Sequence, residues 1–329
     1  MTTMKWNRFA ALALSGALTL SLTACTGGTT NPAGEGEDTY TVGICQLAPH
    51  VALDAATQGF RDALNAALPG RVTFREGNAG GDSPTCATIV NGFVADGVDL
   101  ILANATAALN AAATATADIP VLGTSITEYG VALGIDGFDG VVGGNVSGTS
   151  DLAPLDRQAA MVKEWFPDAQ NVGLLYCSAE PNSRYQVDEV QKYLEQDGIT
   201  CKQFPFADTN DLAAVTQSAV EFSDVIYIPT DNTAANNAGV IDNICRPAGV
   251  PILAGEEALC AGCGVAALTI SYYDLGTATG KMAAKVLTGD ADISQMPIEY
   301  APAVTPKYNA DICESLGITV PDGYLPIEM

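Results

Sequence analysis

Acidic, hydroxyl-bearing and amide side chains recur in this sequence at points where apolar runs stop, and the chain's single histidine stands among them. The loops that hold them contain neither Lys nor Arg. Such loops suit a small molecule with one ammonium and one carboxylate, since an acid takes the first and helix N-termini take the second. The predicted ligand-binding residues are Gln46, His50, Thr106, Ser125, Asp151, Glu180, Asn182, Ser183, Asp231, Asn232 and Glu256.

Each of these residues also has a purely structural interpretation. An acid in such a loop can cap a helix or hold a hinge, and hydroxyls at helix starts, as in Thr106, Ser125 and Ser183, are common caps. Among the acids, Asp151 and Asp231 are the preferred ammonium partners. His50 is a candidate contact in a cleft, and Tyr272 is either a core residue or part of an aromatic wall.

Enzymatic chemistry has little support in the sequence. One histidine excludes a catalytic or metal centre built on several, and no Gly-x-Ser-x-Gly is present. Cys260-Ala-Gly-Cys263 has the spacing of a metal knuckle or a redox pair, but a second close pair is missing. We therefore expect a protein that is not an enzyme and has neither cofactor nor metal.

The N-terminus predicts export. Lys5 and Arg8 precede an apolar run from Phe9 to Leu22, and Leu22-Thr23-Ala24-Cys25 resembles the bacterial lipoprotein box. Residues 1–25 are thus predicted to be a lipoprotein signal peptide, and residues 26–38 a flexible tether. An ordinary signal peptide with an incidental cysteine is the alternative. On the first interpretation the protein is extracytoplasmic and anchored to the membrane bilayer through acylated Cys25.

The other eight cysteines suggest disulfides, because their number is even and the protein is predicted to be exported. We expect at least two bonds, with Cys45, Cys86, Cys260 and Cys263 as candidates. Cys45–Cys86 is the preferred pair, since Cys45 ends the first predicted strand and Cys86 lies in the first turn of a nearby helix.

The amino-acid composition excludes two classes of protein, disordered chains and nucleic-acid-binding proteins. The 329 residues are 48% hydrophobic and 16% charged, which rules out a mainly disordered chain. Lys and Arg total 14 against 38 Asp and Glu, for a net charge of -24. A surface this acidic repels phosphate backbones, so nucleic-acid binding is excluded.

The elements that must position these residues alternate between strand and helix, in two successive series. This pattern predicts an α/β fold with two doubly wound, Rossmann-like lobes and parallel sheets. We expect residues 39–150 to form lobe 1, completed by about 272–296, and residues 151–271 to form lobe 2, completed by about 297–329. Ligand groups in such sheets collect at the carboxyl ends of the strands, where the polar loops lie.

Eight segments in order resemble one family, the ABC-transporter substrate-binding lipoproteins that capture tryptophan, tyrosine or related aromatic amino acids. The segments are Val42–Gln46, His50–Ala55, Asn145–Asp151, Ser178–Ser183, Pro229–Thr233, Ala254–Glu257, Tyr272–Gly276 and Thr279–Ala283. The resemblance implies the type I periplasmic-binding-protein fold, with crossing hinge segments between the lobes. It also implies an aromatic amino acid as ligand and an ABC permease as partner, and we expect a monomer. Val51 and Ala107 depart from the family's pattern, which has Pro at both positions.

The leading hypothesis is therefore a lipid-anchored solute-binding protein that closes on a small zwitterion for import. A ligand-sensing surface lipoprotein of the same fold is the first alternative. A binding protein for another amino acid, a nucleoside or a sugar is the second, and an exported enzyme is the third.

Overall fold

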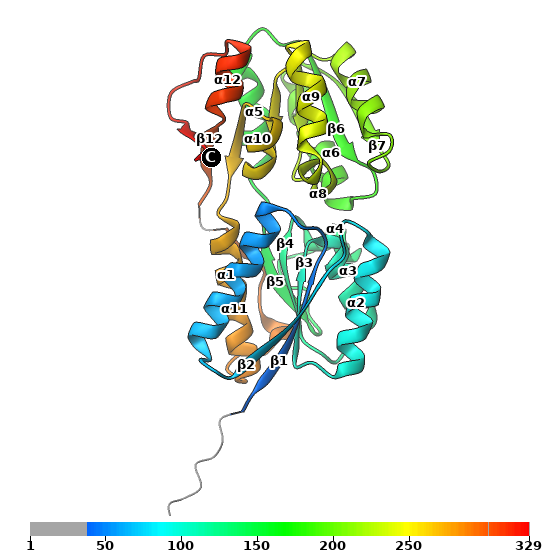
Figure 1. The fold of residues 1–329 in the computed structure, drawn as a ribbon, viewed down its shortest axis with the longest axis vertical. Helices are drawn as coiled ribbons and strands as arrows, with labels where there is room; N and C mark the ends of the chain where they lie inside the picture. Colours follow the sequence, from blue (N-terminus) through cyan, green and yellow to red (C-terminus); the bar gives the residue numbers. More distant parts are fainter. Residues whose placement is uncertain (1–37, 302, 329) are drawn as a thin grey trace, which may run out of the picture. The chain divides into compact units, whose positions relative to one another are not determined.

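The structure is a computed structural model that describes residues 38–301 and 303–328 (Figure 1). The predicted signal peptide, the lipid anchor Cys25 and the tether up to residue 37 lie outside these residues. Within the described part of the chain, no helix combines the length and apolar character needed to cross a membrane.

The first sheet is wholly parallel and has the strand order β11-β5-β4-β3-β1-β2. Its strands are β1 (Tyr40–Gln46), β2 (Val72–Asn78), β3 (Leu100–Asn104), β4 (Val121–Ile126), β5 (Val146–Ser150) and β11 (Glu299–Tyr300). The helices of this lobe are α1 (Val51–Ala67), α2 (Ser83–Asp96), α3 (Thr106–Ala115), α4 (Tyr129–Leu133), α11 (Tyr272–Leu287) and the 3-10 turn η1 (Ile293–Gln295).

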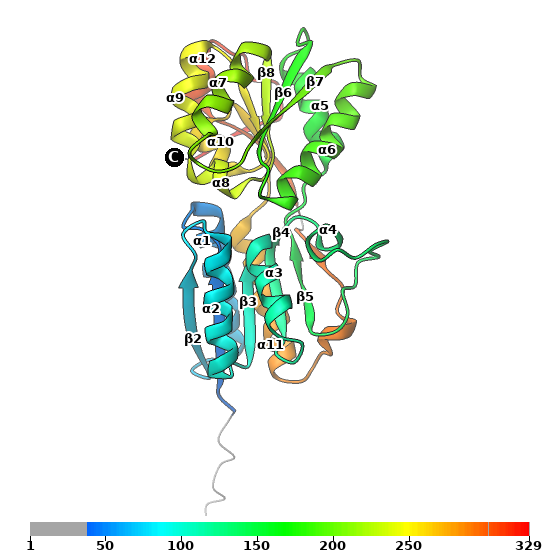
Figure 2. The same ribbon diagram turned by 90° about the vertical axis from the view of Figure 1, so that its right-hand side faces the viewer.

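Successive side chains of the central strands point to opposite faces of this sheet, so they contribute to two hydrophobic cores, one on each face. Ile44, Leu100 and Leu102 pack against α1 and α11 on one face, and Ile101 and Ala103 pack against α2 and α3 on the other. Figure 2 shows α2 and α3 on the near side of the strands, with α11 behind them.

The second sheet has the strand order β13-β12-β10-β9-β8-β6-β7, and only the β10–β12 pair is antiparallel. Its strands are β6 (Asn171–Cys177), β7 (Thr200–Phe206), β8 (Val225–Ile228), β9 (Ile252–Ala254), β10 (Ala266–Thr269), β12 (Thr305–Tyr308) and β13 (Leu325–Pro326). Its helices are α5 (Leu155–Trp165), α6 (Pro181–Gln196), α7 (Leu212–Phe222), α8 (Asn232–Asn236), α9 (Ala238–Ala248), α10 (Glu257–Cys263) and α12 (Ala310–Leu316).

The two-lobed α/β architecture with mostly parallel sheets is confirmed. The chain passes from the first sheet to the second after β5, returns after β10, and passes over again between β11 and β12. One expected boundary is wrong. Glu299 and Tyr300 pair with Thr149 and Ser150 of the first sheet, whereas residues 297–329 had been expected to complete lobe 2. A two-residue edge strand has too little apolar pattern to reveal which sheet it joins.

Helices α1 and α11 lie side by side although more than 200 residues separate them (Figure 1). Gly59 and Gly276 make this close approach possible. A Cβ on Gly276 would overlap the carbonyl oxygen of Ala56, and one on Gly59 would overlap that of Tyr273. The N-terminal half of α1 is thereby held against the start of α11.

The expected disulfides are absent from the structure, in which all eight described cysteines are free thiols. Cys260 and Cys263 lie in one helix, α10, and each donates to a backbone carbonyl, of Gly264 and Leu259 respectively. Cys45 and Cys86 do lie close together, with the Cys45 thiol 3.9 Å from the carbonyl oxygen of Cys86. All but Cys201 are buried, so these cysteines act mainly as small core residues.

Candidate functional site

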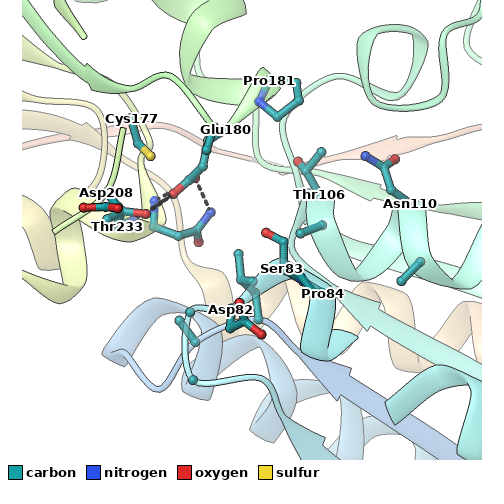
Figure 3. A pocket seen from close by; sticks show the side chains of 18 of the residues that line it. Asp82, Ser83, Pro84, Thr106, Asn110, Cys177, Glu180, Pro181, Asp208 and Thr233 are labelled. Atoms are coloured by element: carbon teal, nitrogen blue, oxygen red, sulfur yellow. Dashed lines mark hydrogen bonds between the residues drawn. The ribbon is translucent and has the colours of Figure 1, made fainter. Parts of the chain in front are cut away.

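Two hollows lie where the carboxyl ends of the two sheets face each other. The outer cleft has a volume of about 970 Å³ and is lined by the starts of α2, α3, α6 and α8. Figure 3 shows Ser83, Pro84, Thr106 and Asn110 on one side of it and Cys177, Glu180 and Thr233 on the other. The inner cavity holds about 10 Å³, roughly the space of one water molecule. It is lined by His50, Leu53, Ser125, Thr127, Asp151, Asn182, Thr230, Asp231, Asn232, Ala235, Glu256 and Tyr272.

Most of the predicted site residues line these two hollows. The inner cavity holds His50, Ser125, Asp151, Asn182, Asp231, Asn232 and Glu256, and the outer cleft holds Thr106 and Glu180. Gln46 lies instead beside a separate surface hollow, where its side chain bonds Asp54 and Thr57. Ser183 is fully buried and donates to the carbonyl of Thr230. Thr127, Thr230 and Tyr272 also line the inner cavity, although the sequence pattern did not predict them as ligand-binding residues.

Three residues that line the inner cavity each have a buried polar atom without a hydrogen-bond partner. These atoms are His50 Nδ1, Ser125 Oγ and Asp151 Oδ1. Buried polar atoms are almost always paired, because an unpaired one costs about 1–3 kcal/mol. Three of them around one cavity therefore indicate a place prepared for a polar ligand.

Backbone strain marks the same edge of the first sheet. Ser125 has a φ of 56° and Ala105, which immediately follows β3, has a φ of 88°. Residues other than glycine rarely adopt such angles, and strained positions concentrate at functional sites. At Ser125 this conformation accompanies the unpartnered hydroxyl in the inner cavity.

Asp151 begins the first crossing between the lobes and is 4% exposed. Its Oδ2 accepts a hydrogen bond of 2.9 Å from the hydroxyl of Tyr272, and its Oδ1 has no partner. Burial raises the pKa of this carboxyl, while the hydrogen bond from Tyr272 acts in the opposite direction. A cation at Oδ1 would stabilise the charged form.

Asp231 and Glu256 are also buried, but backbone N–H groups occupy both oxygens of each carboxylate. Asp231 accepts from the backbone N–H groups of Ala234 and Cys177, at 2.8 and 2.7 Å. Glu256 accepts from those of Ala258 and Leu259 at the start of α10. Burial raises the pKa of each carboxyl to about 7. Both residues act as caps, which leaves Asp151 as the acid with an oxygen open to the cavity.

One hydrogen bond between side chains joins the two lobes directly at the inner cavity. His50 Nε2, at the start of α1, lies 3.2 Å from Asn232 Oδ1, at the start of α8. Asn232 is held in turn by Glu180, whose Oε2 accepts from its side-chain nitrogen at 2.8 Å. The lobes are therefore in contact across the site in this structure.

Neither hollow is lined by a Lys or Arg side chain. Within the described residues, no group of three or more His, Cys, Asp and Glu is arranged to hold a metal ion. The site can thus offer a carboxylate oxygen to a cation, and hydroxyls and backbone N–H groups to an anion. The starts of α1 and α3 lack a capping side chain, so the N–H groups of their first turns remain available.

Comparison with known proteins identifies the family of this chain. The family of ABC transporter substrate binding proteins matches residues 41–326. The chain belongs to this family. The Tyrosine-binding protein of Clostridioides difficile (strain R20291) is 31% identical over 283 residues, covering 84% of this chain and 80% of the relative.

Two solved structures of ABC transporter substrate-binding relatives show the same fold. The ABC domain in complex with L-Trp from Streptococcus pneumonia is 32% identical, with 88% of this chain and 100% of that chain covered and a TM-score of 0.83. A ligand-free, open substrate binding protein with adhesive properties from Clostridium difficile has the same identity and coverage but a TM-score of 0.68. This ABC transporter substrate-binding protein therefore resembles the L-Trp complex more closely than the open structure.

Proposed function

We propose that this protein captures a free amino acid, with an aromatic side chain preferred, between its two lobes. The unpartnered Oδ1 of Asp151 carries the proposal, because a buried carboxylate oxygen without a donor is suited to an ammonium group. Ser125 Oγ lies beside the same cavity and offers a hydroxyl to either end of the ligand.

The ligand's carboxylate then binds backbone N–H groups, since the lining residues include no cationic side chain. Uncapped helix starts supply such groups, and the N-cap residue of α1, His50, lines the inner cavity. The ligand's side chain extends into the outer cleft, which shares Asn182 and Asn232 with the inner cavity. The preference for an aromatic side chain comes from the relatives that bind tyrosine and tryptophan.

Binding on this proposal requires the lobes to separate and close again. An inner cavity of about 10 Å³ cannot admit an amino acid while His50 and Asn232 stay in contact. The ligand then stabilises the closed arrangement, because it contacts both lobes. The protein performs no chemical step on the ligand and acts as a monomer that delivers it to an ABC permease for import.

The same proposal places the protein outside the cytoplasm, on the membrane, with lipid on Cys25. The sequence before residue 38 supports it, with a basic start, an apolar run and Leu22-Thr23-Ala24-Cys25. Replacing Cys25 by Ala should move the protein from the membrane to the soluble fraction of the producing cells. Unchanged fractionation of this variant would refute the anchor but leave the binding proposal intact.

Calorimetry with purified protein tests the ligand. The panel contains L-tryptophan, L-tyrosine, L-phenylalanine, L-leucine, a nucleoside and a hexose, together with 3-indolepropionate, which lacks the ammonium. We expect micromolar or tighter binding of an aromatic amino acid and no measurable binding of 3-indolepropionate. Binding of the hexose or the nucleoside in preference to every amino acid would overturn the proposal.

A further inference from the structure

The carboxylate of Glu180 starts a chain of hydrogen bonds that crosses between the lobes. Five donor groups reach its two oxygens: the backbone N–H and side-chain nitrogen of Asn232, the backbone N–H and hydroxyl of Thr233, and the side-chain nitrogen of Asn182. So many donors match an ionised carboxylate, which can only accept. Glu180 therefore fixes Asn232 with its nitrogen toward Glu180 and its Oδ1 toward His50.

This orientation decides which ring nitrogen of His50 carries hydrogen. Asn232 Oδ1 can only accept, so His50 Nε2, 3.2 Å away, must be the donor. Burial lowers the pKa of His50, against the opposing effects of Asn232, Glu180 and Asp54, which favours the neutral ring. In a neutral ring with its hydrogen on Nε2, Nδ1 holds a lone pair. That Nδ1 is buried, has no partner and belongs to the lining of the inner cavity.

We infer that His50 is a specificity-determining residue whose Nδ1 accepts a hydrogen bond from the ligand's ammonium, and that Asn232 and Glu180 of the opposite lobe set the ring tautomer required for this. The inference rests on the proposed function and deepens it. Asp151 Oδ1 and His50 Nδ1 then form a pair of acceptors, so the ligand must offer at least two N–H groups. A primary ammonium has three, and a tertiary ammonium has one.

The same geometry couples recognition to closure of the lobes. His50 belongs to the first lobe, and Asn232 belongs to the second. When the lobes separate, Nε2 loses the acceptor that holds its hydrogen, and both tautomers become accessible. Contact between the lobes thus prepares the acceptor that the ammonium needs.

Nitrogen NMR reads this tautomer directly, because the chain has only one histidine. Protein labelled with ¹⁵N-histidine gives the signals of a single ring, measured with saturating L-tryptophan or L-tyrosine. We expect the neutral ring with hydrogen on Nε2 in wild type, and a mixture of tautomers in Asn232→Ala. The matched control Asn65→Ala removes an exposed asparagine of α1 and should leave the wild-type spectrum. Hydrogen on Nδ1, or on both nitrogens, in the wild-type complex would overturn the inference.

The binding affinities of wild type and of a His50 variant provide a second, independent test of the inference. His50→Phe removes the acceptor and keeps a flat ring, and α1 does not depend on a cap from this side chain. We expect it to bind L-tryptophan roughly 10- to 100-fold more weakly, the range for one hydrogen bond to a charged group. N,N-dimethyl-L-tryptophan keeps the charge but has one N–H, so it should bind wild type more weakly than L-tryptophan does. His50→Phe should discriminate less between the two ligands than wild type.

The outcomes separate this inference from the proposed function. If wild type binds L-tryptophan or L-tyrosine and His50→Phe binds it equally well, the inference fails and the proposed function stands. If wild type binds no amino acid of the panel, both fail. Thermal unfolding of each variant shows whether it is folded, and Asn232→Ala supplies the test should His50→Phe be unfolded.

Discussion

Tyr272 donates its hydroxyl hydrogen to Asp151 Oδ2 at 2.9 Å, so that only the other oxygen of this carboxylate remains open to the inner cavity. The bond joins two crossings between the lobes, since Asp151 follows β5 and Tyr272 follows β10. Tyr272 is itself fixed, because it packs against Ala52 and Ala56 of α1, and α1 lies against α11. The acid proposed to bind the ammonium is thus oriented by a buried tyrosine that packs against α1.

Removing the Tyr272 hydroxyl should therefore weaken binding without removing any proposed ligand contact. We expect Tyr272→Phe to lower the affinity for L-tryptophan about tenfold, the effect of one hydrogen bond to a charged group. Tyr273→Phe is the control, because Tyr273 is exposed and bonds Asp62 at the surface. Calorimetric titration of wild type and both variants with L-tryptophan measures the three affinities. Equal affinities of both variants and wild type would show that Tyr272 does not orient the site.

The pH dependence of binding gives Tyr272→Phe a further readout. The Tyr272 hydrogen bond lowers the pKa of Asp151, which burial raises, so its loss should raise that pKa further. Because an ammonium needs the ionised carboxylate, affinity should then fall at a higher pH than in wild type as the solution is acidified. Other titratable groups around this carboxyl stay in place in the variant, namely His50, Tyr129, Asp231 and Glu256.

Asp151 and Asp231 should differ sharply when each is changed to Asn. Asp151→Asn removes the charge facing the ammonium and should weaken amino-acid binding about 100-fold or more, since an unpaired buried charge costs about 3–5 kcal/mol. Asp231→Asn should chiefly lower stability, by about 1 kcal/mol, because Asp231 caps α8. Asp156→Asn, an exposed position in the first turn of α5, is the control. Wild-type affinity of Asp151→Asn would refute the ammonium site.

Stability without ligand should fall as the pH rises from about 6.5 to 8. The folded-state pKa values of Asp231 and Glu256, about 7, lie above their usual values of 3.8 and 4.5. The folded protein therefore holds more protons than the unfolded chain in this range, and each carboxyl lowers the free energy of unfolding by at most about 1 kcal/mol per pH unit. Below about pH 6.5 the lowered pKa of His50 acts in the opposite direction.

Chemical denaturation of Glu256→Gln at several pH values tests whether the titration of Glu256 contributes to the pH dependence of stability. The variant keeps an oxygen that can cap α10 but cannot ionise, so its stability should change less with pH than that of wild type. An identical slope in both proteins would mean that Glu256 does not titrate in this range.

The contact between α1 and α11 should not tolerate a methyl group. Gly276→Ala places a Cβ on the carbonyl oxygen of Ala56, so we expect a loss of about 2 kcal/mol or more in unfolding free energy. Gly92→Ala, in α2, is the control, because a Cβ there meets nothing within 4 Å. It should be neutral or stabilise the protein by up to about 1 kcal/mol. A Gly276→Ala variant as stable as wild type would contradict this packing.

The sequence by itself determined the elements whose apolar pattern or end signals are strong. The apolar pattern predicts a first strand over Tyr40–Gln46, a helix from about Val51 to Leu68, and a helix over Tyr272–Leu287. Strand β1 and helix α11 have these bounds, and α1 ends one residue earlier, at Ala67. Helix α10 was not predicted, because its seven residues are too few to show a helical period. They also contain Cys260-Ala-Gly-Cys263, whose spacing is typical of a metal knuckle or a redox pair. Strand β11 was assigned to the wrong lobe for the same reason of length.

Sequence also placed polar side chains at the carboxyl ends of the strands, where nine of the eleven predicted residues line the two hollows. The sequence could not show which of the acidic residues has an oxygen left for a ligand. Asp231, Glu256 and Asp151 each stand in a loop before a helix, yet backbone N–H groups occupy both oxygens of the first two and leave Oδ1 of the third unpartnered. Only the tertiary structure decides this, because the partner of Asp151 is Tyr272, 121 residues away. Residue type sets what a side chain can bond, and the packing of distant segments sets which of its atoms are left for a ligand.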